Sequence, residues 1–230
     1  MSPHPELPSF AVIGPEPSAL FVADVRAGTS AADEWRIVGD NLELIVAPEA
    51  LEGENSPDQP GAFDQLVSVR GQVRGERPRE VNSRGSRSER AAGVEPGRFQ
   101  LVRDVAAWFG PGEGFTLIAV RPRRASGHGD ERVSATAFSA GHQLPVAEPR
   151  LSTTYGELSR PARATLEMWF ADDEQADPQD AVIYPRRAAG EASAPGARHE
   201  VDELAVYVQP FSWRAEGREG TGIYLLARTR

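Results

Sequence analysis

Charged residues interrupt two apolar, strand-like stretches of the chain, and three of them could form a buried site for proton transfer. Arg103 and Asp104 lie within the run from Phe99 to Val120, and Glu167 lies within the run from Ala162 to Phe170. A carboxyl group whose pKa is raised by burial can act as a general acid or base, so Glu167 and Asp104 are the candidate proton-transfer groups. The guanidinium of Arg103 can hold a carboxylate or an enolate oxygen. These three are the predicted catalytic residues.

Aromatic and amide side chains recur in the same strand-like stretches and are candidates for the wall of a ligand cavity. Each stretch has one largely apolar face and one mixed face that carries an aromatic and a polar group. Small barrels can use such a mixed face to line a cavity, and the alternative is that it faces solvent. Both readings stay open at this stage. The predicted substrate-binding residues are Trp108, Trp169, Tyr207, Gln209, Trp213 and Tyr224.

The elements that must position these residues read as short β-strands joined by turns. The run from Phe99 to Val120 is divided by Gly110-Pro111-Gly112-Glu113-Gly114, which is typical of a β-hairpin. Alternation over 63–73 and the pair of apolar runs at 201–213 and 222–227 indicate further strands. Only residues 162–170 also have helical propensity. About a dozen such strands with Gly and Pro turns favour an all-β barrel or sandwich with antiparallel pairing.

The length of 230 residues suits one large all-β domain or two small ones, and we predict a single domain over residues 1–230. Residues 74–98 form an unusual segment, because they contain many Arg and almost no apolar side chains. Such a segment has too little apolar surface to offset its ordering entropy. We therefore expect either a disordered segment or a long polar connection there.

Charge and hydropathy exclude several classes of partner. The formal net charge is −9, and a field of that sign repels phosphate backbones, so a nucleic-acid partner is not expected. No apolar run approaches the roughly 20 residues that span a bilayer, so no membrane insertion is expected. The first residues have no basic segment followed by an apolar one, which predicts a cytoplasmic protein. The oligomeric state is not predicted.

Residue types also exclude several kinds of chemistry. The chain has no Cys, and all 25 basic residues are Arg, so thiolate nucleophiles, zinc–thiolate sites and lysine Schiff bases are ruled out. The four His are scattered without metal-ligand spacing, so no metal site is predicted. There is no G-x-S-x-G elbow, and the Gly-rich segment 217–222 has no helix after it to bind a nucleotide phosphate. We predict no cofactor.

Several segments of the chain carry a family resemblance in their order and spacing. They are Gln100–Trp108, Thr116–Glu131, Glu148–Tyr155, Ala164–Trp169, Tyr184–Glu191 and Phe211–Tyr224. Together they resemble lipocalin-like (calycin) proteins related to carotenoid hydratase, also called hydroxyneurosporene synthase. The resemblance covers roughly residues 63–230 and rests on order and spacing, not on a unique motif.

The resemblance implies an antiparallel lipocalin-like β-barrel with a central cavity for a hydrophobic small molecule. Relatives of this family include hydratases and cyclases, some of which promote intramolecular [4+2] cycloaddition. The implied function is a cyclase or isomerase that folds an apolar, unsaturated polyketide or terpenoid and promotes its cyclisation. Such chemistry needs shape and a few hydrogen bonds more than a nucleophile. The alternatives are a carrier without catalysis and a hydratase of a polyene.

Two departures from the family pattern qualify this expectation. Many relatives have a His-Trp-Gly segment where this chain has Ser83-Arg84-Gly85-Ser86-Arg87-Ser88-Glu89, so their acid chemistry is not expected here. The chain is also shorter than the usual relatives with two barrels. A single or merged barrel is therefore expected.

Overall fold

The computed structural model is built almost entirely of β-strands. It describes residues 10–13, 19–22, 24–26, 34–49, 63–76, 78–89, 99–170, 185–201 and 203–229. Among them, no helix is long and apolar enough to cross a membrane. The strands are β1 (Phe10–Ile13), β2 (Ala19–Val22), β3 (Asp24–Arg26), β4 (Trp35–Gly39), β5 (Leu42–Pro48), β6 (Phe63–Val73), β7 (Arg79–Glu89), β8 (Phe99–Gly110), β9 (Glu113–Pro122), β10 (Arg132–Ser139), β11 (His142–Tyr155), β12 (Pro161–Phe170), β13 (Arg186–Ala192), β14 (Ala197–Val201), β15 (Leu204–Ala215) and β16 (Arg218–Thr229).

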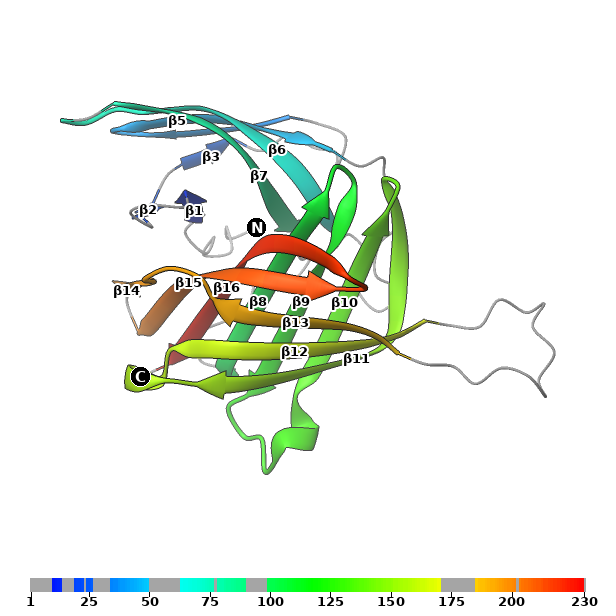
Figure 1. Cartoon of the computed structure of the whole chain (residues 1–230). Coiled ribbons are helices and arrows are strands. Elements are labelled where there is room, and N and C mark those ends of the chain that lie inside the picture. Colours follow the sequence, from blue (N-terminus) through cyan, green and yellow to red (C-terminus); the bar gives the residue numbers. More distant parts are fainter. Residues whose placement is uncertain are drawn as a thin grey trace, which may run out of the picture.

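The strands from β8 onward form a closed antiparallel barrel (Figure 1). Their order is β13-β12-β11-β10-β9-β8-β16-β15, and β13 pairs with β15 to close an eight-stranded ring. Closure leaves no unpaired strand edge around the ring, which is how antiparallel sheets avoid edge-to-edge association. The predicted all-β antiparallel barrel is therefore confirmed.

The central hairpin forms as its sequence predicts. Strands β8 and β9 pair antiparallel, and Trp108 lies opposite Gly114 next to the turn. Gly112 adopts a φ of +64° in this turn, a conformation that favours glycine. A side chain there would also come within 2.7 Å of the backbone nitrogen of Gly141 in the next hairpin. The GPGEG sequence thus allows two neighbouring turns to touch.

Residues 162–170 form a strand, as expected, despite their helical propensity, and Arg163 to Phe170 pair with β11 or β13. Strand β11 runs through Pro145 and Pro149 without a break, with a bulge between Val146 and Glu148. Proline tolerates a strand at such irregular positions, where no ladder hydrogen bond from its nitrogen is needed.

A second, five-stranded sheet in the order β3-β4-β5-β6-β7 lies beside the barrel (Figure 1). The two sheets meet at Leu66, which is fully buried and packs in one cluster with Trp108 and Phe138 of the barrel. The indole nitrogen of Trp108 donates a hydrogen bond of 3.0 Å to the carbonyl oxygen of Gly85 in β7. The outer face of β8 is therefore covered by protein and not by water.

This second sheet changes the reading of residues 74–98. Part of that segment, Arg79–Glu89, is strand β7 and pairs with β6 along its whole length. The prediction of a connection without secondary structure is thus wrong for these residues. Their polar sequence is explained by position, since β7 is an edge strand whose described side chains are mostly exposed. Residues 77 and 90–98 lie outside the described residues, and the mobility of the segment stays a prediction.

Aromatic side chains fill the barrel at mid-height. Phe115 meets the indole of Trp213 edge-on with ring centroids 5.0 Å apart, and Phe211 packs against both Trp213 and Tyr224. All four side chains are at most 1% exposed. We call these four residues the aromatic column. The column therefore fills this part of the lumen.

Candidate functional site

One end of the barrel interior holds a buried ion pair. Arg103 in β8 faces the lumen together with Val105 and Ala107, since alternate residues of a strand share a face. Its guanidinium Nη2 donates to the carboxylate Oε2 of Glu131, which lies just before β10. The two side chains are only 7% and 12% exposed. Removing one member of such a pair leaves the other as an uncompensated buried charge.

A chain of hydroxyl groups extends this ion pair across the lumen. Nη1 of Arg103 donates a hydrogen bond of 3.2 Å to Oγ1 of Thr153 in β11. The same Oγ1 lies 2.7 Å from the hydroxyl oxygen of Tyr224 in β16, and either hydroxyl can be the donor. When Thr153 donates, the Tyr224 O–H is left to donate to another group. We call Arg103, Glu131, Thr153 and Tyr224 the polar cluster.

Electrostatics keep Arg103 charged and Tyr224 neutral. Burial by itself would lower the pKa of Arg103, but electrostatic interactions with Tyr224, Glu131 and Tyr155 raise it above its ordinary value. Burial raises the pKa of the Tyr224 hydroxyl well above its ordinary value, against the smaller opposing effect of Arg103. At neutral pH, Tyr224 is thus a hydrogen-bond donor and not a base.

One donor of the polar cluster has no partner. Nε of Arg103 is buried and makes no hydrogen bond within the described residues. Leaving such a group unsatisfied costs free energy, so this N–H is available to an acceptor such as a water molecule or a ligand oxygen.

The structure brings five of the nine sequence-predicted residues into the barrel. Arg103 and Tyr224 belong to the polar cluster, and Trp213 belongs to the aromatic column. Tyr207 is half-buried and packs against the barrel core, with the guanidinium of Arg198 5.5 Å from its ring centroid. Gln209 is buried, but its amide nitrogen donates to the carbonyl oxygen of Ala194 in the connection from β13 to β14. Its amide N–H is thus used by the fold.

The other four lie on the outer face of the barrel, which corrects the prediction of one shared lumen. Glu167 and Trp169 alternate with buried Leu166 and Met168 and so point outward. The Glu167 carboxylate pairs with Arg187 at 2.9 Å in an exposed position. The Trp169 ring lies on the same outer face, under the guanidinium of Arg150 at 4.6 Å.

Trp108 and Asp104 share the outer face of β8. Trp108 is buried against the second sheet, so it fills an interface within the chain and does not line the lumen. Asp104 alternates with the inward-facing Arg103 and Val105. The structure thus places the mixed face of β8 outside the lumen, where its Trp108 end is buried against the second sheet.

Sequence reasoning missed Glu131 and Thr153. Glu131 stands at the end of a polar segment, and Thr153 in a strand with other Thr and Ser, so neither stands out by residue type. They meet Arg103 only through barrel closure, at sequence separations of 28 and 50. Arg103 lies on an otherwise apolar strand face. A charged residue there needs a partner, and this is the signal in the sequence that points to further polar residues at the site.

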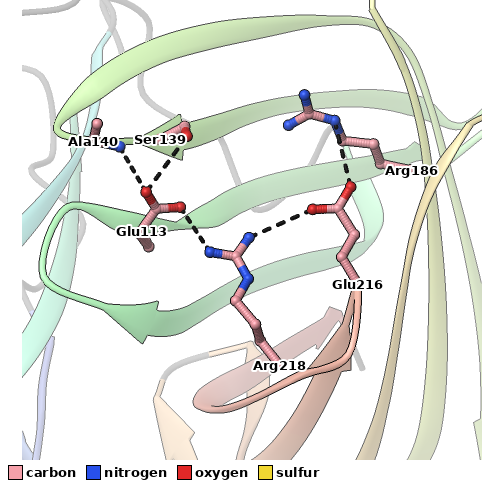
Figure 2. A network of polar contacts seen from close by, with 6 residues as sticks. All are labelled: Glu113, Ser139, Ala140, Arg186, Glu216 and Arg218. Carbon is pink, nitrogen blue, oxygen red and sulfur yellow. Dashed lines mark hydrogen bonds and ion pairs between the residues drawn. The ribbon is translucent and has the colours of Figure 1, made fainter.

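A network of charged side chains spans the opposite end of the barrel (Figure 2). The Glu113 carboxylate accepts hydrogen bonds from the Ala140 backbone at 2.8 Å, the Ser139 hydroxyl and Arg218 at 3.0 Å. These bonds, that of Ala140 first, lower the pKa of Glu113. Glu216 continues the network, since it pairs with both Arg218 and Arg186.

Little space remains beneath this network. The hollow there has a volume of about 40 Å³ and is lined by Phe109, Phe115 and Met168 among others. Such a volume holds a few water molecules at most. The charged network thus marks the closed end, and the polar cluster at the other end is the candidate functional site.

Among the described residues, no group of three or more His, Asp or Glu is placed to hold a metal ion.

Comparisons with known proteins identify the fold. No protein-family model and no curated protein matches the chain. Among solved structures, it is similar to a Nitrosomonas europaea protein provisionally assigned as AttH, with 12% identity and a TM-score of 0.56, covering 92% of this chain and 68% of the other. It is also similar to kievitone hydratase from Nectria haematococca, with 10% identity and a TM-score of 0.49, covering 92% and 74%. The chain is a lipocalin-like β-barrel protein by fold.

Proposed function

We propose that this protein binds a small, apolar, unsaturated molecule through an oxygen function at the polar cluster and promotes its cyclisation or isomerisation without a cofactor. The observation that carries the proposal is the unpaired, buried Nε–H of Arg103 beside the Tyr224–Thr153 hydroxyl pair. A polyketide or terpenoid intermediate is the substrate class we propose, because apolar residues such as Val105 and Leu226 share the core with Tyr224. The family resemblance supports the same substrate class.

The chemistry follows from donors that are fixed in place. Arg103 and Tyr224 can donate hydrogen bonds to a carbonyl oxygen and polarise it. An unsaturated carbonyl compound becomes more reactive toward cyclisation, isomerisation and addition of water when its oxygen is held in this way. The reaction class of a hydratase is thus the runner-up, since it uses the same donors.

A carrier function is the second candidate, and a specific observation favours it. The two carboxyl groups predicted to transfer protons, Glu167 and Asp104, lie on the outer face. The carboxylate of Glu131 is engaged by Arg103. Among the described residues of the polar cluster, no carboxylate is therefore free to act as a base, so binding without turnover is consistent with the same residues.

The test is a screen with α,β-unsaturated ketones, in which binding is followed by NMR and products by chromatography. We compare wild type with Thr153→Val, which removes the hydroxyl between Arg103 and Tyr224. Thr154→Val is the matched control, because the adjacent Thr154 is exposed on the outer side of β11. Binding lost only in Thr153→Val supports the site, and product formation separates an enzyme from a carrier. Equal behaviour of both variants, or no binding to wild type, refutes the proposal.

A further inference from the structure

Glu131 decides which oxygen the polar cluster can accept. Its carboxylate is in contact with Nη2 of Arg103, at the position where a bound carboxylate would otherwise form its ion pair. Nη1 of Arg103 is taken by Thr153. The fold thus already neutralises the charge of Arg103 and leaves Nε–H as the buried donor without a partner.

A ligand at the cluster would meet hydrogen-bond donors but no uncompensated positive charge. Tyr224 stays protonated, so its hydroxyl is a neutral donor. An incoming carboxylate would face the Glu131 carboxylate in a poorly solvated position, where repulsion between like charges is weakly screened. A neutral carbonyl oxygen meets the same donors without this repulsion.

Two further arginines, Arg121 and Arg228, flank Leu101 of β8 near the polar cluster. Nε of Arg121 is buried without a hydrogen-bond partner among the described residues, and Arg121 also interacts electrostatically with Asp130. The guanidinium of Arg228 lies 5.2 Å from the ring centroid of Tyr155 and is only half-buried, so solvent screens it. Glu131 is the charged partner in direct contact with Arg103.

We infer that the polar cluster selects a neutral carbonyl compound over the matching carboxylate, and that Glu131 is the residue that determines this specificity. The inference rests on the proposed function, because it presumes that a ligand oxygen reaches Arg103. It narrows the earlier expectation that Arg103 holds a carboxylate or enolate. Exclusion by a repulsive group is a common way to gain specificity.

The experiment uses two probes that differ only in the oxygen-bearing end. Benzalacetone is an apolar unsaturated methyl ketone, and trans-cinnamate is its carboxylate counterpart of nearly equal shape. The chain has no Lys, so the ketone cannot form a Schiff base with a lysine side chain. Dissociation constants for both probes are measured at neutral pH by calorimetry or NMR titration. We expect wild type to bind the ketone at least about tenfold more tightly, or about 1.4 kcal/mol.

Glu131→Gln then tests the cause. The variant keeps the shape of the side chain and removes its charge, so Arg103 becomes available to an anion and the preference falls at least tenfold or reverses. Glu148→Gln is the matched control, because Glu148 also pairs with an arginine, Arg150, but in an exposed position. It keeps the wild-type ratio. Unfolding curves for both variants show whether each is folded.

Each outcome separates the two ideas. If wild type binds cinnamate as tightly as the ketone, or if folded Glu131→Gln keeps the wild-type ratio, the selectivity inference is overturned while the proposed binding site stands. If neither probe nor any other unsaturated ketone binds, the proposed function fails and the inference fails with it. Should Glu131→Gln not fold, the wild-type ratio still decides whether a neutral ligand is preferred.

Discussion

Replacing Trp213 by Ala tests whether the aromatic column is a packed core or the wall of an open cavity. The indole is fully buried between Phe115 and Phe211. It lies so close to Gly190 and Gly222 that a side-chain carbon at either glycine would fall within 2.8 Å of the ring. This is the packing of a core. Glycines on the neighbouring strands leave the space that the large ring occupies.

The magnitude follows from the buried area. A buried indole removes about 200 Å² from water, and at about 25 cal/mol per Å² this corresponds to about 5 kcal/mol. The alanine side chain retains part of that area, and measured large-to-small changes of this kind cost about 3–5 kcal/mol. We therefore expect Trp213→Ala to lower the free energy of unfolding by about 3–5 kcal/mol. That is a large part of the stability of an ordinary domain.

Trp169→Ala is the matched control, because Trp169 is half-exposed on the outer face and its described ring contact is with Arg150. A contact of that kind contributes about 0.5–1 kcal/mol at an exposed site. Urea unfolding followed by far-UV circular dichroism measures both variants, and it does not depend on the fluorescence of the residue removed. A loss below about 1 kcal/mol for Trp213→Ala, combined with weaker ligand binding, would refute the packed-core reasoning and restore Trp213 as a lumen wall.

Further predictions concern single contacts. Gly190→Ala places a carbon against the indole of Trp213 and should lower the thermal midpoint, at a cost of about 1–3 kcal/mol; an unchanged midpoint would contradict the clash. The raised pKa of Tyr224 stabilises the fold below the ordinary tyrosine pKa of about 10, and this contribution is lost as pH rises through the folded value. The stability difference between wild type and Tyr224→Phe should accordingly shrink in alkali, and a constant difference would argue against burial of that hydroxyl. Glu113→Gln should lower the free energy of unfolding by less than about 1 kcal/mol at neutral pH. The difference from wild type should fade as pH drops through the lowered pKa of Glu113, which unfolding curves measured over a range of acid pH can show. Glu167→Gln should leave ligand binding and turnover unchanged, since its carboxylate pairs with solvent-exposed Arg187; a tenfold loss would return Glu167 to the site.

Local sequence alone determined the central hairpin and several of the strands. The GPGEG turn joins β8 and β9 as predicted, and β6 covers the alternating run Phe63–Val73. These features depend on neighbours within a few residues, through turn conformation and side-chain alternation, so a single sequence contains them. The residues on each strand face were correct for the same reason, because alternation has a period of two in any strand.

Only the tertiary structure decided which face of each strand points inward. In β15 the mixed face with Tyr207 and Trp213 lines the lumen, whereas in β8 and β12 the mixed faces with Trp108 and Trp169 lie outside. Alternation distinguishes two faces but does not label them. The apolar face of a barrel strand usually points to the interior. In β8 the outer face is also buried, by the second sheet, so apolar residues there do not indicate the interior of the barrel.

The candidate site shows the same limit most clearly. The sequence identified Arg103 as a charged residue in an apolar strand, and it listed Tyr224 as a ligand contact. Their partners Glu131 and Thr153 come from other strands and reach Arg103 only when the ring closes. Strand order and register set those distances, and neither is contained in the local pattern of any one strand.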